Sequence, residues 1–287
     1  MRTNWTNLLL TCAACALAAC GGGGGGGGGT PEFNSPPPPP PNYVKIFPGV
    51  TTTTNFAVLG YEASGTAPIG DGFSVRYDAA QQAYIIDTPF FAPGKFDATS
   101  EDAVSWNADS FATVLKPKPA NPASDFEYTT LAKYYGCPWD CFNLGVLAFG
   151  TATPQLAVPT TGIATYDAIV AGITLDTGLA VGGTASLQFD FAAGTLAGSF
   201  EPILNPDVTP VSLGQYSFLD TVYGVGDATF SGGMRHTGNN LTGAFNGLFT
   251  GPNAQELMAR WTASYVNPST QQNADMFGVW IGKDGGP

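Results

Sequence analysis

The sequence is poor in charged residues, and in basic residues above all. Charged residues make up 11% of the 287 positions, and Lys and Arg together number 10 against 22 Asp and Glu, a formal net charge of -12. A chain this acidic offers no positive surface for a phosphate backbone. We therefore expect no nucleic acid among its partners.

Histidine and the common catalytic motifs are also scarce. His236 is the single histidine, which argues against a His-rich metal site and against a Ser-His-Asp triad. The sequence contains no G-x-S-x-G elbow, H-E-x-x-H motif, Walker loop or dinucleotide fingerprint. The adjacent acids Glu101 and Asp102 would point to opposite faces of a strand, unlike a glycosidase pair. We predict a protein that is not an enzyme, without catalytic residues, metal or cofactor, and we expect His236 in a solvated glycine-rich turn.

The first residues are typical of an export signal. Residues 1–19 include the positive Arg2, an apolar stretch that is too short to cross a bilayer comfortably, and no acid. They lead into Leu17–Cys20, which resembles the bacterial lipobox, where the cysteine is acylated and becomes the mature amino terminus. We expect a lipoprotein signal peptide over 1–19 and fatty acyl chains such as palmitate on Cys20. The alternative is an ordinary signal peptide with a chance cysteine.

Residues 20–42 are of low complexity. Glycines fill 21–29 and prolines fill 36–41, which predicts a flexible coil followed by an extended spacer. We interpret this segment as a tether that holds the folded part away from the membrane. Gly21, rather than Asp, follows Cys20, and in well-studied Gram-negative systems this permits export to the outer membrane.

Two cysteines remain in the folded part once the signal is removed and Cys20 is acylated. Cys137 and Cys141 close a very small ring in which Gly136 and Pro138 favour a turn. In an oxidising compartment this spacing predicts a local disulfide. Two free thiols, or a redox or metal pair, are the alternatives, although no neighbouring His or basic residue supports the latter.

Residues 43–157 contain short β-like runs broken by turn residues. Phe73–Tyr77 and Tyr84–Asp87 flank a polar loop and predict a hairpin, whereas the prolines of Lys116–Pro122 predict a loop. We expect an irregular β-rich subdomain here.

The pattern becomes regular over 158–287. Leu187, Phe189 and Phe191 alternate with polar residues, and Phe245 and Phe249 repeat the period of two. We extend the same buried face to Trp261, Ala263 and Tyr265 and then to Phe277, Val279 and Ile281. Eight strands are predicted, at 162–172, 184–191, 195–201, 211–219, 226–231, 238–250, 259–267 and 275–283.

These strands predict an all-β fold whose C-terminal domain is an eight-stranded antiparallel up-and-down β-barrel filled by side chains. A transmembrane barrel is the alternative, but it needs an apolar outer band, whereas the outward positions carry Ser, Gln, Asp, Asn and Thr.

Three segments carry a family resemblance. Phe149–Pro154, Pro159–Tyr166 and above all Gly243–Glu256, with its G-P-N-A-x-E loop, resemble transferrin-binding protein B-like surface lipoproteins. The resemblance covers most of 43–283 and implies a small β-rich handle before the barrel. Leu257–Ala259 stands where the family often has Gly-Gly, so we expect a helical or longer turn there. For the loop motif itself we favour a strand-ending turn without a ligand.

The resemblance implies a non-catalytic, lipid-anchored protein of the Gram-negative outer membrane, displayed on the cell surface by a lipoprotein translocon. Such a protein captures a nutrient carrier or solute and passes it to a TonB-dependent receptor. Tyr134, Tyr135 and Trp139 are the candidate ligand contacts. Their alternative role is to pack the handle against the barrel, and the alternative function is a structural or adhesive surface lipoprotein without a soluble ligand.

Overall fold

The computed structural model describes residues 43–46, 49–63, 67–89, 94–97, 104–107, 110–115, 126–136, 143–205, 207–219 and 221–285. Nearly all of their regular structure is β, and no α-helix occurs in these ranges. Short 3-10 turns stand at η2 (Gln155–Ala157) and η3 (Pro252–Ala254). In the same described part, no helix is long and apolar enough to cross a membrane.

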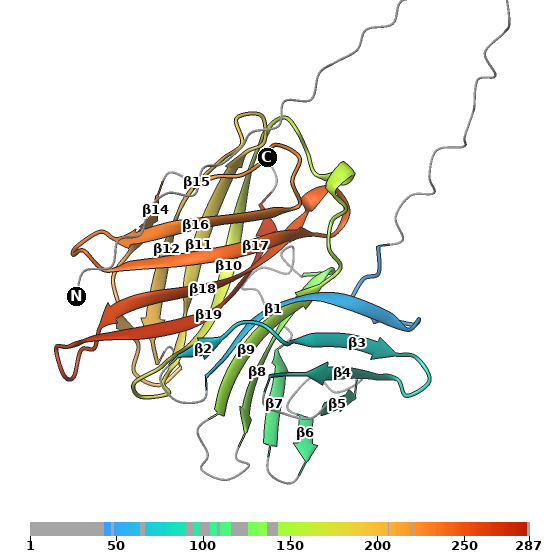
Figure 1. The fold of residues 1–287 in the computed structure, drawn as a ribbon, viewed down its shortest axis with the longest axis horizontal. Helices are drawn as coiled ribbons and strands as arrows, with labels where there is room; N and C mark the ends of the chain where they lie inside the picture. The colour runs from blue at the N-terminus through green and yellow to red at the C-terminus, as the bar shows by residue number, and fades with distance from the viewer. Residues whose placement is uncertain are drawn as a thin grey trace, which may run out of the picture. The chain divides into compact units, whose positions relative to one another are not determined.

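The handle is one curled antiparallel sheet, in the order β5-β4-β3-β1-β9-β8-β7-β6, with β2 beside β1 (Figure 1). Its two ends, β5 and β6, contact each other. The strands are β1 (Thr54–Ala63), β2 (Pro68–Ile69), β3 (Ser74–Asp78), β4 (Ala83–Asp87), β5 (Gly94–Asp97), β6 (Val104–Asn107), β7 (Ser110–Leu115), β8 (Thr129–Gly136) and β9 (Asn143–Gly150).

The predicted hairpin of the handle is confirmed. β3 and β4 pair from Ser74 opposite Asp87 to Asp78 opposite Ala83. The Asp78 carboxylate accepts hydrogen bonds from the backbone N–H groups of Ala80 and Gln81 and so fixes the turn between the strands.

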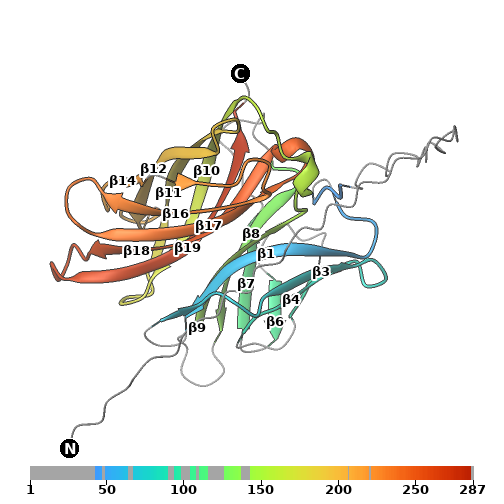
Figure 2. The same ribbon diagram turned by 45° about the horizontal axis from the view of Figure 1, so that its top comes forward.

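The predicted eight-stranded barrel is also confirmed, and Figures 1 and 2 show it from two sides. Its ring runs β11-β10-β19-β18-β17-β16-β14-β12 and closes through β11 and β12, with the short β13 and β15 also paired to β12. The strands are β10 (Ile163–Thr174), β11 (Ala180–Asp190), β12 (Thr195–Leu204), β13 (Val211–Ser212), β14 (Tyr216–Phe218), β15 (Thr221–Val222), β16 (Thr229–His236), β17 (Thr242–Thr250), β18 (Glu256–Val266) and β19 (Asn273–Asp284).

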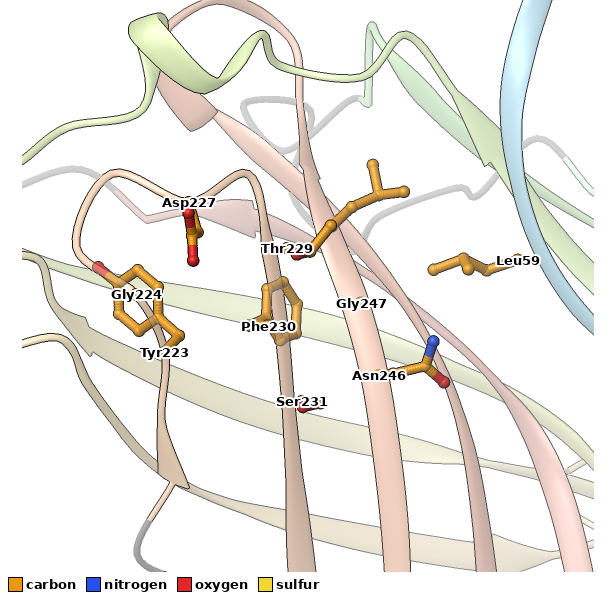
Figure 3. Close-up of a pocket in the computed structure, with 10 residues that line it drawn as sticks. Leu59, Tyr223, Gly224, Asp227, Thr229, Phe230, Ser231, Asn246 and Gly247 are labelled. Atoms are coloured by element: carbon orange, nitrogen blue, oxygen red, sulfur yellow. The ribbon is translucent and has the colours of Figure 1, made fainter. Parts of the chain in front are cut away.

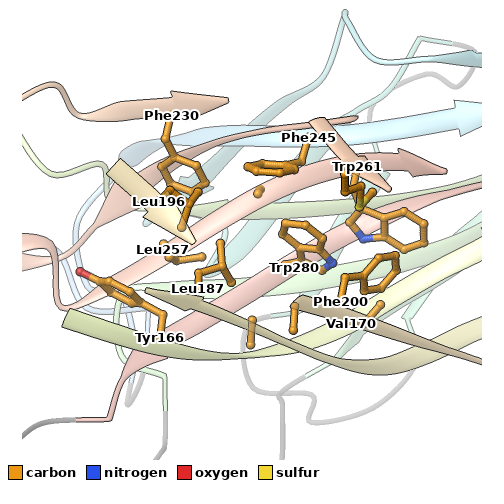
Figure 4. Packing of buried hydrophobic residues seen from close by; sticks show 14 of the residues in the cluster. Tyr166, Val170, Leu187, Leu196, Phe200, Phe230, Phe245, Leu257, Trp261 and Trp280 are labelled. Atoms are coloured by element: carbon orange, nitrogen blue, oxygen red, sulfur yellow. The ribbon is translucent and has the colours of Figure 1, made fainter. Parts of the chain in front are cut away.

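Aromatic rings pack inside the barrel. The Phe189 and Phe249 ring centroids lie 4.8 Å apart, and those of Phe200 and Trp261 lie 4.7 Å apart. Figure 4 shows part of this cluster. Gly278 is needed beside Trp261, because a Cβ at that position would lie 2.4 Å from the Trp261 ring. The large rings thus pack directly against the backbone of the barrel wall where glycine leaves no side chain in the way.

The prediction of which residues of the last barrel strand face the interior is wrong. Phe277, Val279 and Ile281 of β19 do not face the interior; they belong to an apolar cluster that joins the barrel wall to the handle residues Val146 and Ala148. The interior positions of β19 are Met276 and Trp280. Both faces of β19 are buried, so the strand is apolar at successive positions.

The boundaries of two predicted strands also change. The predicted strand 211–219 divides into β13 and β14 around Gly214, whose φ is +83° and where a Cβ would overlap the His236 ring. β16 continues to His236, because Gly232 and Gly233 pair with β17 instead of forming a turn. The residues Leu257–Ala259 are part of strand β18, so the expected helical or longer turn is wrong.

Candidate functional site

The glutamate of the G-P-N-A-x-E loop joins the barrel to the handle. Glu256 is 1% exposed, and its two carboxylate oxygens accept hydrogen bonds from the backbone N–H groups of Glu127, at 2.6 Å, and Tyr128, at 3.0 Å. Burial raises the pKa of this carboxyl group, while the two N–H donors oppose that effect. Glu256 is therefore a buried structural acceptor at the start of β18.

Other side chains of the quoted motifs strengthen the same junction. The hydroxyls of Thr129 and Thr250 lie 2.5 Å apart, and the Thr153 hydroxyl donates to the Gly251 carbonyl at 2.6 Å. Asn253 and Ala254 adopt left-handed backbone conformations with φ of 54° and 60°. The loop is a strand-ending turn, as the sequence predicted, and its polar groups are used by the fold.

The predicted ligand contacts lie apart from this junction. Tyr134 is on β8 and is 1% exposed in the core of the handle, where it belongs to a cluster of handle residues and not to the cluster that joins the handle to the barrel. Tyr135 is the next residue of the same strand. Trp139, Cys137, Cys141 and Cys20 lie outside the described residues, and the proposals for them stand on the sequence.

His236 is not a solvated turn residue. It ends β16 half-buried, with its ring 5.0 Å from the Tyr216 ring in an edge-on contact. Its Nε2 lies 3.1 Å from the Leu213 carbonyl oxygen, and its Nδ1 accepts a hydrogen bond from the Gly238 N–H. The imidazole therefore supports the loops around β13 and β14.

A hollow of about 400 Å³ lies between the handle and the barrel wall. Leu59 of β1 points into it from the handle, as Figure 3 shows. Thr229 and Ser231 of β16 and Asn246 of β17 line the barrel side, and Asp227 lies near one end. We call this space the β16–β17 hollow. Its lining is mixed, because the apolar side chains of Leu59 and Leu248 lie alongside these polar residues.

A second hollow, of about 480 Å³, lies farther along the wall and is lined by Pro68, Thr242 and Asp275, among others. We call it the β17–β18 hollow. Sequence reasoning gave no indication of either hollow, because each is formed by outward residues of several barrel strands together with handle residues distant in sequence.

Arg260 reaches from the same barrel wall to the handle. Its Nε donates to Asn246 Oδ1 at 2.9 Å, and its Nη1 donates to the Gly70 carbonyl and lies 3.5 Å from Asp71 Oδ1. The guanidinium also lies over the Tyr61 ring, 5.2 Å from its centroid. Arg260 therefore fixes the loop after β2 to the outer face of β17 and β18.

Exposed aliphatic side chains gather at one end of the barrel. Leu156 is fully exposed, and Ile163 and Val225 are 68% and 52% exposed. Gln155 donates to Asp227 at 3.0 Å, which joins η2 to the turn that holds Val225. A Cβ on Gly226 in that turn would lie 3.5 Å from the methyl group of Thr160, three residues before Ile163. We call Leu156, Ile163 and Val225 the apolar rim. Among the residues described, no group of three or more His, Cys, Asp or Glu side chains is placed to hold a metal ion.

The architecture is thus that of a β-rich handle joined to a closed eight-stranded barrel. No protein-family model and no curated protein matches the sequence. Among solved structures, a transferrin-binding protein B double mutant from Haemophilus parasuis aligns with 82% of this chain at 15% identity and a TM-score of 0.49. The isotype 1 transferrin-binding protein B of Neisseria meningitidis aligns with 79% at 16% identity, also with a TM-score of 0.49. This chain spans less than half of those proteins, 46% and 43% of their lengths.

Proposed function

We propose that this chain is a lipid-anchored lipoprotein of the Gram-negative outer membrane that captures a nutrient carrier or solute and has no catalytic role. The sequence Leu17–Cys20 supports the anchor, with the lipid on Cys20, and the Gly- and Pro-rich segment up to residue 42 supports a tether. Display on the cell surface through a lipoprotein translocon, and transfer of the captured molecule to a TonB-dependent receptor, belong to the same proposal.

The apolar rim is the observation that carries the capture proposal. Three aliphatic side chains exposed on adjacent segments form the kind of patch that binding proteins present to partners, whereas single exposed aliphatic residues are common on any surface. Val158 and Tyr223, two residues from Leu156 and Val225 in the sequence, are buried in the core of the barrel and so tie these segments to it. A prealigned rim loses little conformational entropy when a partner binds.

The roles of the buried aromatic and acidic side chains also favour a binding function over a catalytic one. Aromatic side chains pack the barrel interior, and the buried acid Glu256 is engaged by two backbone N–H groups of the handle. In the described part of the chain these groups serve the fold, and the surface supplies the area for recognition. We therefore place the captured molecule, a carrier protein in the first instance, at the apolar rim and the adjoining loops.

The test is capture by the full chain, purified in mild detergent and immobilised. Proteins from serum and growth medium are passed over the immobilised chain, and those that are retained are identified by mass spectrometry. They are then purified, and their affinity for the chain is measured. We expect one partner whose affinity falls by about tenfold or more in the double variant Leu156→Ser with Val225→Ser. Val208→Ser is the matched control, because Val208 is 85% exposed in the loop that follows β12.

Two results would contradict this function. Equal loss of affinity in the rim variant and in Val208→Ser would remove the rim from recognition. Binding of the intact chain only to surfaces or to other membrane components would instead favour the structural or adhesive alternative.

The anchor has a separate test. Cys20→Ala should release the protein from the membrane fraction, because about 0.8 kcal/mol per buried methylene is lost with the acyl chains. Protease treatment of intact cells then reports whether the anchored chain faces outward. A Cys20→Ala protein that fractionates with the membrane as before would refute the lipid assignment.

A further inference from the structure

The apolar rim lies in a part of the chain that has no basic residues. Residues 134–234 contain no Lys or Arg, and all three rim residues fall within that range. Lys283 of β19 is a described cation at this end of the barrel strands, and its ladder partners are Asp167 of β10 and Glu256 of β18. Its positive charge is therefore offset by acids beside it, and the charges next to the rim are negative.

Asp227 is held beside Leu156 and Val225. Its Oδ1 accepts the hydrogen bond from Gln155, the residue before Leu156, and its N–H donates to the Gly224 carbonyl in the turn that holds Val225. Its second oxygen, Oδ2, lies beside Gly224, where a Cβ would overlap it, and accepts no hydrogen bond from the described residues. The carboxylate is thus fixed at the rim and has an oxygen to offer a cation.

Asp190 has the corresponding place beside Ile163. The two residues are partners in the β10–β11 ladder, so their side chains share the outward face of the wall. Asp190 Oδ1 accepts hydrogen bonds from two backbone N–H groups of the turn that leads to β12, which fixes the carboxylate. Val225 lies over the same turn, because a Cβ on Gly194 would come 3.2 Å from its Cγ2 methyl group. Each rim residue therefore has a fixed carboxylate near it.

The β16–β17 hollow begins at the turn that holds Asp227. Of the described residues that line the hollow, Asp227 alone is charged, and Thr229 and Ser231 follow it along the same wall (Figure 3). The volume of about 400 Å³ is larger than the side chain of an arginine or a lysine. A long basic side chain that reaches Asp227 from the rim can therefore lie in the hollow, with its apolar stem against Leu248.

We propose that the partner captured at the apolar rim is a protein whose contact surface has an apolar centre bordered by Lys and Arg. The apolar centre packs on Leu156, Ile163 and Val225, and the basic side chains pair with Asp190 and Asp227. This inference rests on the capture function proposed above and adds the chemistry of the partner. Opposite charges at the border of a contact speed association and exclude partners of the wrong sign. A second copy of this chain, which would bring the same acids, is among those excluded.

The probe is a library of short random peptides displayed on phage and selected on the immobilised full chain in mild detergent. Phages that also bind the double variant Leu156→Ser with Val225→Ser are removed, so the remaining peptides depend on the rim. We expect these peptides to combine apolar residues with an excess of Lys and Arg over Asp and Glu. Rim-dependent peptides without that excess, or a library that yields no rim-dependent peptide, would overturn the proposal.

Charge variants then test the border directly, with the most enriched peptide as the ligand. Asp190→Asn with Asp227→Asn removes the rim charges, while each Asn Oδ1 can still accept the hydrogen bonds that Oδ1 accepts now. Glu201→Gln with Asp275→Asn is the matched control, because both acids are exposed elsewhere on the barrel and also accept a side-chain hydrogen bond. At low salt the rim variant should bind the peptide about tenfold more weakly, and the control less than about twofold. Equal losses would reduce the attraction to the net charge of the chain and overturn the proposal.

The basic border and the capture function can fail separately. If the protein retained in the capture experiment depends on Leu156 and Val225 but binds the Asp190→Asn, Asp227→Asn variant as tightly as wild type, the basic border is wrong and the capture function stands. If neither that protein nor any peptide depends on the rim, both are wrong. A concentration-dependent dimer of the chain that Leu156→Ser with Val225→Ser weakens would assign the rim to a second copy and would also overturn the proposal.

Discussion

The Glu256 carboxylate of the barrel lies 3.0 Å from the backbone nitrogen of Tyr128 in the handle. Its other oxygen accepts a hydrogen bond from the N–H of Glu127, so one side chain orders the entry into β8. The contact joins residues more than a hundred positions apart in the chain, and it explains why a glutamate belongs at the end of the G-P-N-A-x-E loop. The handle and barrel therefore share a buried, hydrogen-bonded junction as well as an apolar contact.

Glu256→Gln should destabilise the fold by about 1–3 kcal/mol, because the amide has one acceptor oxygen for two buried N–H donors. Equilibrium denaturation of wild type and variant, followed by tryptophan fluorescence, measures the difference. Glu201→Gln is the matched control, since Glu201 is exposed and accepts a hydrogen bond from Gln215. Equal stability of the three proteins would show that the junction does not contribute to the free energy of unfolding.

The same carboxyl group predicts a pH dependence. Burial raises the folded-state pKa of Glu256 above the ordinary 4.5, and the nearby Lys283 opposes the shift. A raised carboxyl pKa means that the folded protein binds more protons, so this group stabilises the fold at low pH and its contribution is lost as pH rises above 4.5 through the folded pKa. Measured across that window, wild-type stability should fall relative to Glu256→Gln. Parallel pH profiles would contradict the shift, and a rise would reverse its sign.

The barrel could be predicted from the sequence because residues along its strands alternate between buried apolar and exposed polar side chains. Leu187 and Phe189 are fully buried while Gln188 between them is exposed, which is the pattern that was recognised. The rule failed on β19, where Phe277 faces the handle and Trp280 faces the interior, so both faces are apolar. Period-two reasoning cannot choose between two buried faces.

The site was less predictable than the fold. The aromatic-rich and turn-rich segment around Tyr134 predicts a ligand contact, but strand β8 buries Tyr134 in the core of the handle. Arg260 is a single cation in an apolar run, and its role depends on Gly70 and Tyr61, which come near it only through the tertiary fold. A charge inside a predicted barrel strand was the available signal, and it indicates a partner without identifying one.

Substitution of Phe189 tests how much the packing of the barrel core contributes to stability. Its side chain is fully buried and contacts the rings of Phe230 and Phe249 at centroid distances of 5.0 and 4.8 Å. Phe189→Ala should lower the free energy of unfolding by about 3–5 kcal/mol, because the neighbouring rings cannot close the cavity. Gln188→Ala, one residue earlier and exposed, should change it by less than about 0.5 kcal/mol. Comparable losses in the two variants would mean that the interior adapts to the missing ring.

The cysteine pair can be tested by labelling. In a protein produced without residues 1–20, Cys137 and Cys141 are the remaining cysteines. Alkylation without reductant should modify neither, and both should react after reduction and unfolding. The disulfide should add only a modest stability, because so short a loop removes little entropy from the unfolded chain. Labelling of both residues before reduction would favour the free-thiol alternative.

Substitutions at Trp139 and Tyr134 distinguish a side chain that recognises a ligand from one that packs within the fold. Tyr134 is buried in the handle core, where a Cβ on Gly145 would overlap its ring, so Tyr134→Ala should cost about 3 kcal/mol of stability. We propose Trp139 as a ligand contact on the turn that the sequence predicts between the cysteines, so Trp139→Ala should weaken binding of the purified captured partner by about tenfold with little change in stability. Titration calorimetry and thermal unfolding on both variants distinguish the two roles. If Trp139→Ala lowers the melting temperature as much as Tyr134→Ala and leaves the affinity unchanged, Trp139 packs within the fold and recognition lies with the apolar rim alone.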